Sequence, residues 1–142
     1  MTSAQHACNY ALLHFRPHRE TGEMVNVGVV GICLQPCLFH FMIEEKMTAR
    51  LKAVFPEQKE EAFAAAAAAM KREMERVKAT IHDPKTCQLA FNKVVRPRES
   101  IFCFSEPRTI LTADALHFAE VLFSRYVRME ALPQHNAHLA AA

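Results

Sequence analysis

Glycine is scarce in this chain, because the 142 residues include only Gly22, Gly28 and Gly31. The usual phosphate-binding loops need several closely spaced glycines, so that the backbone can come close to the anion. Three glycines that form no such pattern exclude nucleotide-dependent catalysis by a known loop type. We expect no cofactor.

The chain also lacks the features of an exported or membrane protein. No apolar run approaches the roughly 20 residues that a membrane-spanning helix needs. The first nine residues have neither the basic region nor the apolar stretch of a secretory signal. The five cysteines are an odd number and mostly lie in apolar runs, which favours reduced buried thiols over a disulfide framework. These observations predict a cytoplasmic protein that does not enter a membrane.

A strong net charge is absent as well, since the formal charge at pH 7 is only +2. So small a charge gives little attraction for nucleic acid over the whole surface. With 51% hydrophobic and 23% charged residues, the composition is that of a folded protein, and the length suits one domain. We expect a single domain over residues 1–132 and a tail over residues 133–142, which show no apolar periodicity.

The first part of the chain has the pattern of an antiparallel meander. Residues 10–15, 24–34 and 38–43 are apolar runs rich in β-branched or aromatic side chains, and turn-forming residues separate them. Residues 101–104 form a clear late strand. Residues 87–95 are ambiguous between strand and helix, and we favour a strand.

Three stretches have helical periodicity. Apolar residues repeat at helical spacing over residues 47–55 and from about residue 112 to residue 127. Between them, residues 56–80 predict the longest helix, with acidic residues at its start and basic residues at its end. The predicted fold is therefore α+β, with an antiparallel sheet of about four or five strands and two or three helices packed on one face.

No familiar catalytic or metal-binding pattern is present. Cys33, Cys37 and His40 lack the spacing of a zinc site, so we expect no bound metal. Ser105 follows a strand but has no Gly-x-Ser-x-Gly sequence around it, and Cys103 is expected in a strand interior, where a thiol is inert. We assign no catalytic residue.

A group of polar residues interrupts the apolar strands and is the best candidate for a site. We call it the polar set; it comprises Arg16, Glu23, Asn26, Ser105, Glu106 and Arg108. It could bind a ligand, and its two glutamates could do acid-base work if one pKa were raised. It could instead be a structural network, in which Asn26 satisfies backbone groups and Glu23 pairs with an arginine. A surface that binds a partner is the third hypothesis.

Basic residues in two places are the candidates for contact with nucleic acid. Arg96 and Arg98 flank a proline in a predicted turn. The end of the long helix adds four more, namely Lys71, Arg72, Arg76 and Lys78. Glu73 and Glu75 interrupt this second group, which is typical of a solvated helix face with pairs such as Lys71–Glu75. We therefore do not expect nucleic acid as the partner.

Three sequence blocks together resemble a known family. Residues 10–17 (YALLHFRP), 22–29 (GEMVNVGV) and 104–108 (FSEPR) are similar to the bacterial family catalogued as domain of unknown function 3037, and residues 122–127 resemble its closing helix. The family has no established activity. Its members often stand beside proteins with a kinase domain like that of the persistence toxin HipA, which implies a small cytoplasmic partner or modulator. This chain has His14 where the family usually has an arginine.

These observations lead to three functional hypotheses. The first is a non-catalytic cytoplasmic accessory protein that binds or regulates a partner protein, in a toxin-antitoxin or phage-related setting, and that could also form a homo-oligomer. The second is a hydrolase or nuclease-like enzyme that uses Glu23 and Glu106. The third is a protein that binds nucleic acid weakly.

Overall fold

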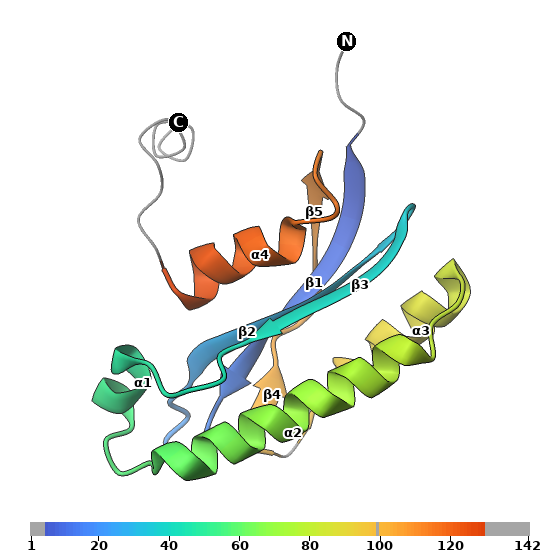
Figure 1. Cartoon of the computed structure of the whole chain (residues 1–142). Coiled ribbons are helices and arrows are strands. Elements are labelled where there is room, and N and C mark those ends of the chain that lie inside the picture. Colours follow the sequence, from blue (N-terminus) through green and yellow to red (C-terminus); the bar gives the residue numbers. More distant parts are fainter. Residues whose placement is uncertain (1–4, 99, 130–142) are drawn as a thin grey trace, which may run out of the picture.

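The computed structural model describes residues 5–98 and 100–129, and within them five strands form one antiparallel sheet. The first three strands, β1 (His6–Phe15), β2 (Val25–Leu34) and β3 (Cys37–Ile43), make the predicted meander (Figure 1). Two short strands follow late in the chain, β4 (Phe102–Phe104) and β5 (Arg108–Thr112). The predicted α+β class and antiparallel sheet are confirmed. The predicted tail, residues 133–142, lies outside the described residues.

Strand β1 is the centre of the sheet. One of its edges pairs with β2 from Cys8 to Phe15. Its other edge pairs with β5 over His6–Tyr10 and with β4 over Leu13–Phe15. Because β4 and β5 share this edge, they act as one strand with a break opposite Leu12.

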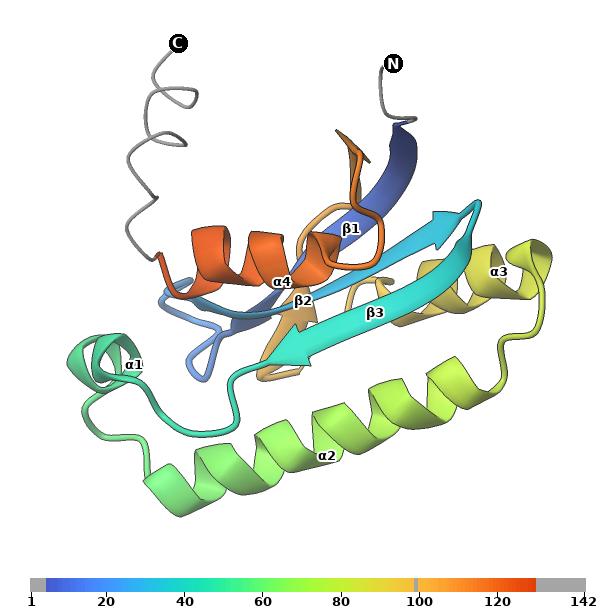
Figure 2. The same cartoon turned by 45° about the horizontal axis from the view of Figure 1, so that its top comes forward.

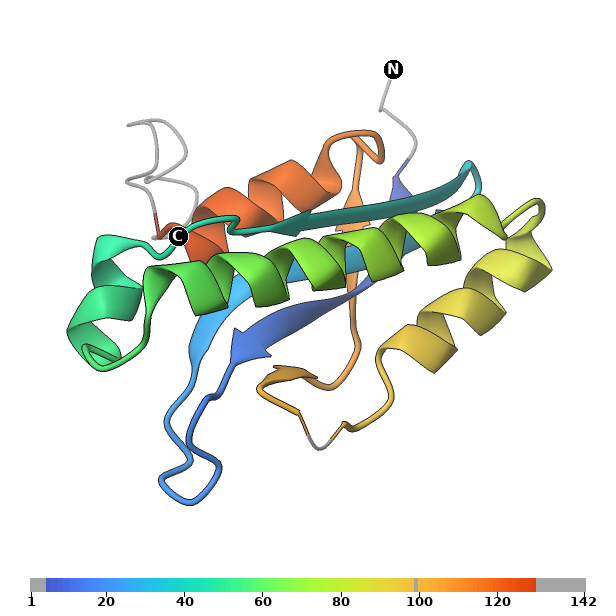
Figure 3. The ribbon, with the colours of Figure 1, turned by 60° about the horizontal axis from the view of Figure 1, so that its bottom comes forward.

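Three helices cover one face of the sheet, as Figures 2 and 3 show. They are α1 (Ala49–Val54), α2 (Glu60–Ala79) and α3 (Pro84–Val94). Phe15 is the centre of the core on this face, where its ring lies 5.0 Å from that of Phe63 and 5.6 Å from those of Phe55 and Phe102. None of the described helices combines the length and the apolar character needed to cross a membrane.

A fourth helix covers the opposite face. Helix α4 (Phe118–Leu122) continues into a π-helical turn, η1 (Phe123–Val127), and both pack against the sheet (Figure 1). Helices therefore lie on both faces of the sheet. This explains why β2 is almost continuously apolar, since both of its faces are buried.

Two predictions about secondary structure were wrong. Residues 87–95 belong mostly to α3 and not to a strand, because Asp83 and Thr86 form a capping box around Pro84 at the first helical turn. The last helix begins at Phe118 and not near Thr112, which ends β5 instead. Leu116, which lies within the predicted helix, is 61% exposed in the intervening turn.

The cysteines also differ from expectation. Cys8 and Cys33 lie opposite each other on β1 and β2 and form a disulfide bond, so the prediction of reduced thiols was wrong for these two. Cys37, Cys87 and Cys103 are free, as predicted. Register explains the bond, because two cysteines directly opposite each other on antiparallel strands come close enough to bond.

Gly31 is the point at which α4 comes closest to the sheet. A Cβ atom at this position would lie 2.5 Å from Cε2 and 2.6 Å from Cζ of the Phe118 ring. Phe118 is 2% exposed, so its ring has little room to move. The glycine therefore provides the space in which the first residue of α4 packs on β2.

We expect Gly31→Ala to lower the free energy of unfolding by about 1–3 kcal/mol, because the added methyl group overlaps the Phe118 ring. Urea denaturation measures this. Phe118→Leu removes the two clashing atoms, so the same substitution should cost less in that background. Equal costs in both backgrounds would contradict the assignment.

Candidate functional site

The two halves of the polar set lie on opposite edges of β1. Glu23 and Asn26 come just before and within β2, whereas Ser105, Glu106 and Arg108 lie at the break between β4 and β5. The two segments are therefore not neighbours in the sheet, and β1 separates them.

Asn26 connects the sheet to the last helix. Its side-chain Nδ2 donates a hydrogen bond to the carbonyl oxygen of Tyr126 in η1, at 3.2 Å. Its Oδ1 lies 2.7 Å from Nδ1 of His14 on β1, so the neutral imidazole donates from Nδ1. The strand register shifts here and leaves Val27 as an extra residue of β2, and Asn26 satisfies polar groups beside this bulge.

His14 itself is held in the neutral form. Burial is the main cause that lowers the pKa of its imidazole, and the positive charge of Arg16 lowers it further, whereas the hydrogen bond with Asn26 acts in the opposite direction. A neutral His14 suits a structural hydrogen bond, because no charge has to be buried.

Ser105 completes the hydrogen bonding of β1 at the break between β4 and β5. Its backbone N–H donates to the carbonyl oxygen of Leu12 at 2.9 Å, and the Leu12 N–H donates to its hydroxyl oxygen, also at 2.9 Å. The hydroxyl in turn donates to the carbonyl oxygen of Glu106 at 3.2 Å. The Ser105 side chain therefore replaces the backbone carbonyl that a continuous strand would have supplied.

Glu23 and Glu106 are not brought together. Glu23 is two residues before Val25, which pairs with Phe15, whereas Glu106 follows Ser105, which bonds to Leu12. With about 3.3 Å per residue, the two glutamates are separated by roughly 15 Å or more along β1, in addition to lying on its two sides. Both side chains are exposed. This geometry provides no carboxylate pair for acid-base chemistry.

The two arginines of the polar set also lie apart. Arg16 follows β1 and is half-buried; its backbone N–H donates to the carbonyl oxygen of Ile101 at 2.6 Å, and its Nε is buried without a hydrogen-bond partner among the described residues. Arg108 begins β5 opposite Tyr10 and is exposed. Of the polar set, Asn26 and Ser105 thus have clear structural roles.

A groove between α2 and α3 has a volume of about 970 Å³, is open to solvent, and is a more prominent candidate site than the polar set. We call it the α2–α3 groove. Its apolar lining residues are Val77, Leu89, Ala90 and Val94. Its charged lining residues are Glu73, Arg76, Lys93, Arg96 and Arg98. Figure 3 shows the two helices that form its walls.

The α2–α3 groove is positively charged, with four basic residues and one acidic residue, a local charge of +3. Arg98 pairs with Glu73 at 2.9 Å, donates to the Val94 carbonyl at 3.3 Å, and lies over the Phe104 ring. It therefore connects α2, the end of α3 and β4. Within the described chain, the three other basic residues of the groove form no ion pair.

Sequence reasoning identified Arg96 and Arg98 but missed the groove. Residues 87–95 were expected to be a strand, and on a strand Leu89 and Lys93 would have had different neighbours. The signal that was available is the Asp-Pro-x-Thr capping sequence at residues 83–86, which marks the start of a helix.

A second cavity, of about 840 Å³, lies between β3, α1 and η1. Both of its carboxylates are already paired. Glu44, the one buried charged residue of the described chain, accepts from Arg128 at 3.0 Å, and Glu45 accepts from Lys71 at 2.6 Å. We found no three His, Cys, Asp or Glu residues in the described chain that could together hold a metal ion.

Comparison with known proteins gives a match at the family level. The model of a family described as "Protein of unknown function (DUF3037)" matches residues 10–127. No curated protein and no solved structure matches the chain. The matched range runs from β1 to η1 and so includes the helices that form the α2–α3 groove.

We expect Ser105→Ala to lower the free energy of unfolding by about 1–2 kcal/mol, because it leaves the Leu12 N–H without an acceptor. Chemical denaturation tests this. Glu106→Gln is the matched control. This neighbouring side chain is exposed, so removal of its charge should change the free energy of unfolding by less than about 0.5 kcal/mol. A larger effect of the control than of Ser105→Ala would contradict the structural role.

His14 should titrate below its ordinary pKa of 6.5, and Arg16→Gln should raise its pKa, because a nearby positive charge is removed. Two-dimensional NMR of the imidazole measures both. A lowered pKa means that the stability due to neutral His14 is complete above pH 6.5 and is lost as the pH falls through the lowered pKa of the folded state. A His14 pKa above 6.5 would exclude the buried, neutral imidazole.

Proposed function

The chain belongs to the family of proteins of unknown function DUF3037, and we propose that it is a non-catalytic protein that binds a partner protein through its α2–α3 groove. The observation that carries this proposal is one groove that combines exposed apolar surface with basic residues that form no ion pair within the described part of the chain. A specific pocket for a small molecule would be more enclosed.

The shape of the groove suits an amphipathic helix. Its walls are two helices, and its accessible apolar residues come from both of them, Val77 from α2 and Leu89 and Ala90 from α3. Leu89 is 59% exposed, so it is available to a ligand. A partner helix with apolar residues at spacings of three and four could place them against this strip.

The positive charge of the groove favours a partner with acidic side chains. Arg76, Lys93 and Arg96 surround the apolar strip, and none is neutralised by an ion pair within the described residues. Acidic side chains on the partner would meet these bases, which favours association and orients the helix. We therefore propose an acidic amphipathic segment as the ligand.

A protein segment is favoured over nucleic acid by the absence of stacking surfaces. No aromatic residue is among the described residues that line the groove. Proteins that bind single strands use aromatic side chains for base stacking together with a basic groove. Nucleic acid remains the alternative, and a steep dependence of binding on salt concentration would support it.

For the cellular setting, we propose a bacterial cytoplasmic protein. The three free cysteines are typical of a reducing compartment, although the Cys8–Cys33 bond is more typical of an oxidising one. The sequence motifs resemble a family whose members often stand beside proteins with a HipA-like kinase domain. Such a protein is therefore the first partner to test, in a toxin-antitoxin or phage-related setting.

Selection from a random peptide library on the immobilised protein tests the proposal. We expect the selected peptides to be acidic, with apolar residues at helical spacing, and to lose about 10- to 100-fold in affinity for Leu89→Asp and for the double variant Lys93→Glu, Arg96→Glu. All three side chains are exposed, so these variants should fold.

Lys78→Glu is the control, because it makes the same kind of charge reversal at one position of α2 outside the groove. It should bind the selected peptides as the wild type does, apart from a small change in association rate. Peptides that are basic, or that bind the groove variants and the wild type equally, would contradict the proposed site.

A further inference from the structure

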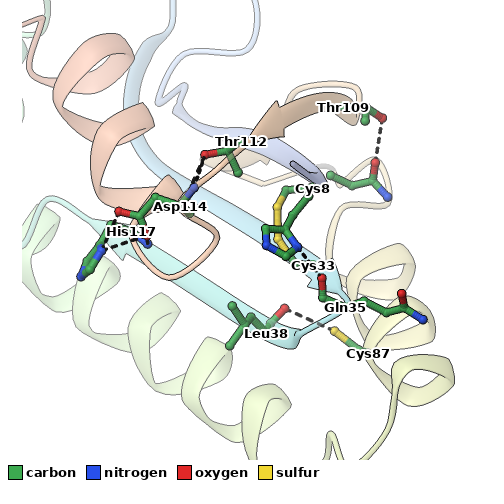
Figure 4. The surroundings of a disulfide bond; sticks show 11 residues. Cys8, Cys33, Gln35, Leu38, Cys87, Thr109, Thr112, Asp114 and His117 are labelled. Carbon is green, nitrogen blue, oxygen red and sulfur yellow. Dashed lines mark hydrogen bonds and ion pairs between the residues drawn. A yellow bond between two sulfur atoms is a disulfide. The ribbon is translucent and has the colours of Figure 1, made fainter. Parts of the chain in front are cut away.

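Four of the five cysteines gather at one end of the sheet, near the turn between β2 and β3. Cys8 and Cys33 form the disulfide bond on the two strands. Cys37, the first residue of β3, has an exposed free thiol. Cys87 in α3 has a buried free thiol, and Figure 4 shows it beside Leu38 and close to this turn.

These two free cysteines are neighbours in space. The Cys87 thiol donates to the carbonyl oxygen of Leu38 at 3.5 Å, and Leu38 is the residue after Cys37. The side chain of Cys37 is also close enough to that of Cys87 to affect its pKa. Burial raises the pKa of Cys87 to about 12, and the neighbouring Cys37 adds to this increase.

We propose that Cys37 and Cys87 form a second, reversible disulfide bond, which links the start of β3 to α3 when the protein meets a small-molecule disulfide such as oxidised glutathione. Cys37 is the residue that reacts first, because its thiol is exposed. Cys87 is the resolving residue, because its thiol lies beside Cys37 and is 0% exposed.

The reaction takes place in two balanced steps. The thiolate of Cys37 attacks one sulfur of the small-molecule disulfide, forms a mixed disulfide and releases one small thiolate. Cys87 then attacks the Cys37 sulfur, its proton passes to the departing small thiolate, and the second small thiol leaves. Two protein thiols are oxidised and one small-molecule disulfide is reduced to two thiols.

The other cysteines are placed so that they do not compete. Cys8 and Cys33 belong to the core under α4, whereas Cys87 belongs to the core under α1, α2 and α3, on the opposite face of the sheet. Cys103 is buried on β4 opposite His14, at the other end of β1. Exchange between the two pairs would therefore require the sheet to open.

The bond would close a loop of 50 residues, from position 37 to position 87, that contains β3, α1 and α2. A loop of this length restricts the unfolded chain strongly, so we expect the oxidised protein to melt roughly 10 °C above the reduced form.

The test is to treat the purified protein with oxidised glutathione and to count its free thiols. We expect the count to fall from three to one, and peptide mapping to find Cys37 joined to Cys87. Dithiothreitol should restore three thiols, since the buried Cys8–Cys33 bond is shielded from the reductant. The thermal shift should appear and disappear with the bond.

Three variants distinguish the possible outcomes. Cys37→Ser should form no new intramolecular bond and show no thermal shift, and Cys87→Ala should stop at a persistent mixed disulfide on Cys37. Cys103→Ala is the matched control and should oxidise as the wild type does. A mixed disulfide that persists in the wild type, a bond between two chains, or an intramolecular bond that survives Cys37→Ser would overturn the proposal.

Discussion

The complete hydrogen bonding of β1 is the constraint on which the rest of the structure depends. This strand has neighbours on both edges and helices against both faces, so few of its backbone groups can turn to water instead. At Leu12 the neighbouring strand is broken, and the backbone N–H and hydroxyl of Ser105 supply both missing partners. Asn26 has the comparable role at the bulge on the other edge, where its side chain hydrogen-bonds both to His14 and to the carbonyl oxygen of Tyr126. These contacts hold β4, β5 and η1 in place around the central strand.

The residues that carry the resemblance to the family are therefore largely residues that build the fold. Asn26 and Ser105 satisfy polar groups, and the apolar positions of β1 and β2 within these blocks belong to the two cores. Glu23, Glu106 and Arg108 are exposed around this framework and share no common cleft in the described chain. The helical hairpin of α2 and α3, in contrast, presents a basic groove that the framework does not require. Function is best sought there.

Local pattern was enough to predict the meander and the long helix, because β-branched runs and an alanine-rich segment favour one conformation each. It failed for α3, whose apolar residues fit a strand almost as well and whose start depends on a cap made by Asp83 and Thr86. The role of Ser105 depends on Leu12, 93 residues away, and the Cys8–Cys33 bond depends on strand register. Neither is visible in a local pattern. The α2–α3 groove was missed for the same reason, since it exists only once α3 is a helix beside α2.

The polar set is structural and the α2–α3 groove binds the partner, and an NMR titration tests this division of roles most directly. Isotope-labelled protein would be titrated with a peptide selected on it, and backbone shifts would be mapped on the structure. We predict that the largest changes in chemical shift fall on α2 and α3, around Leu89, Lys93 and Arg96, and that residues 23–26 and 105–108 keep their shifts. Changes centred on Arg16, Glu23 and Glu106, with α2 and α3 unaffected, would contradict it.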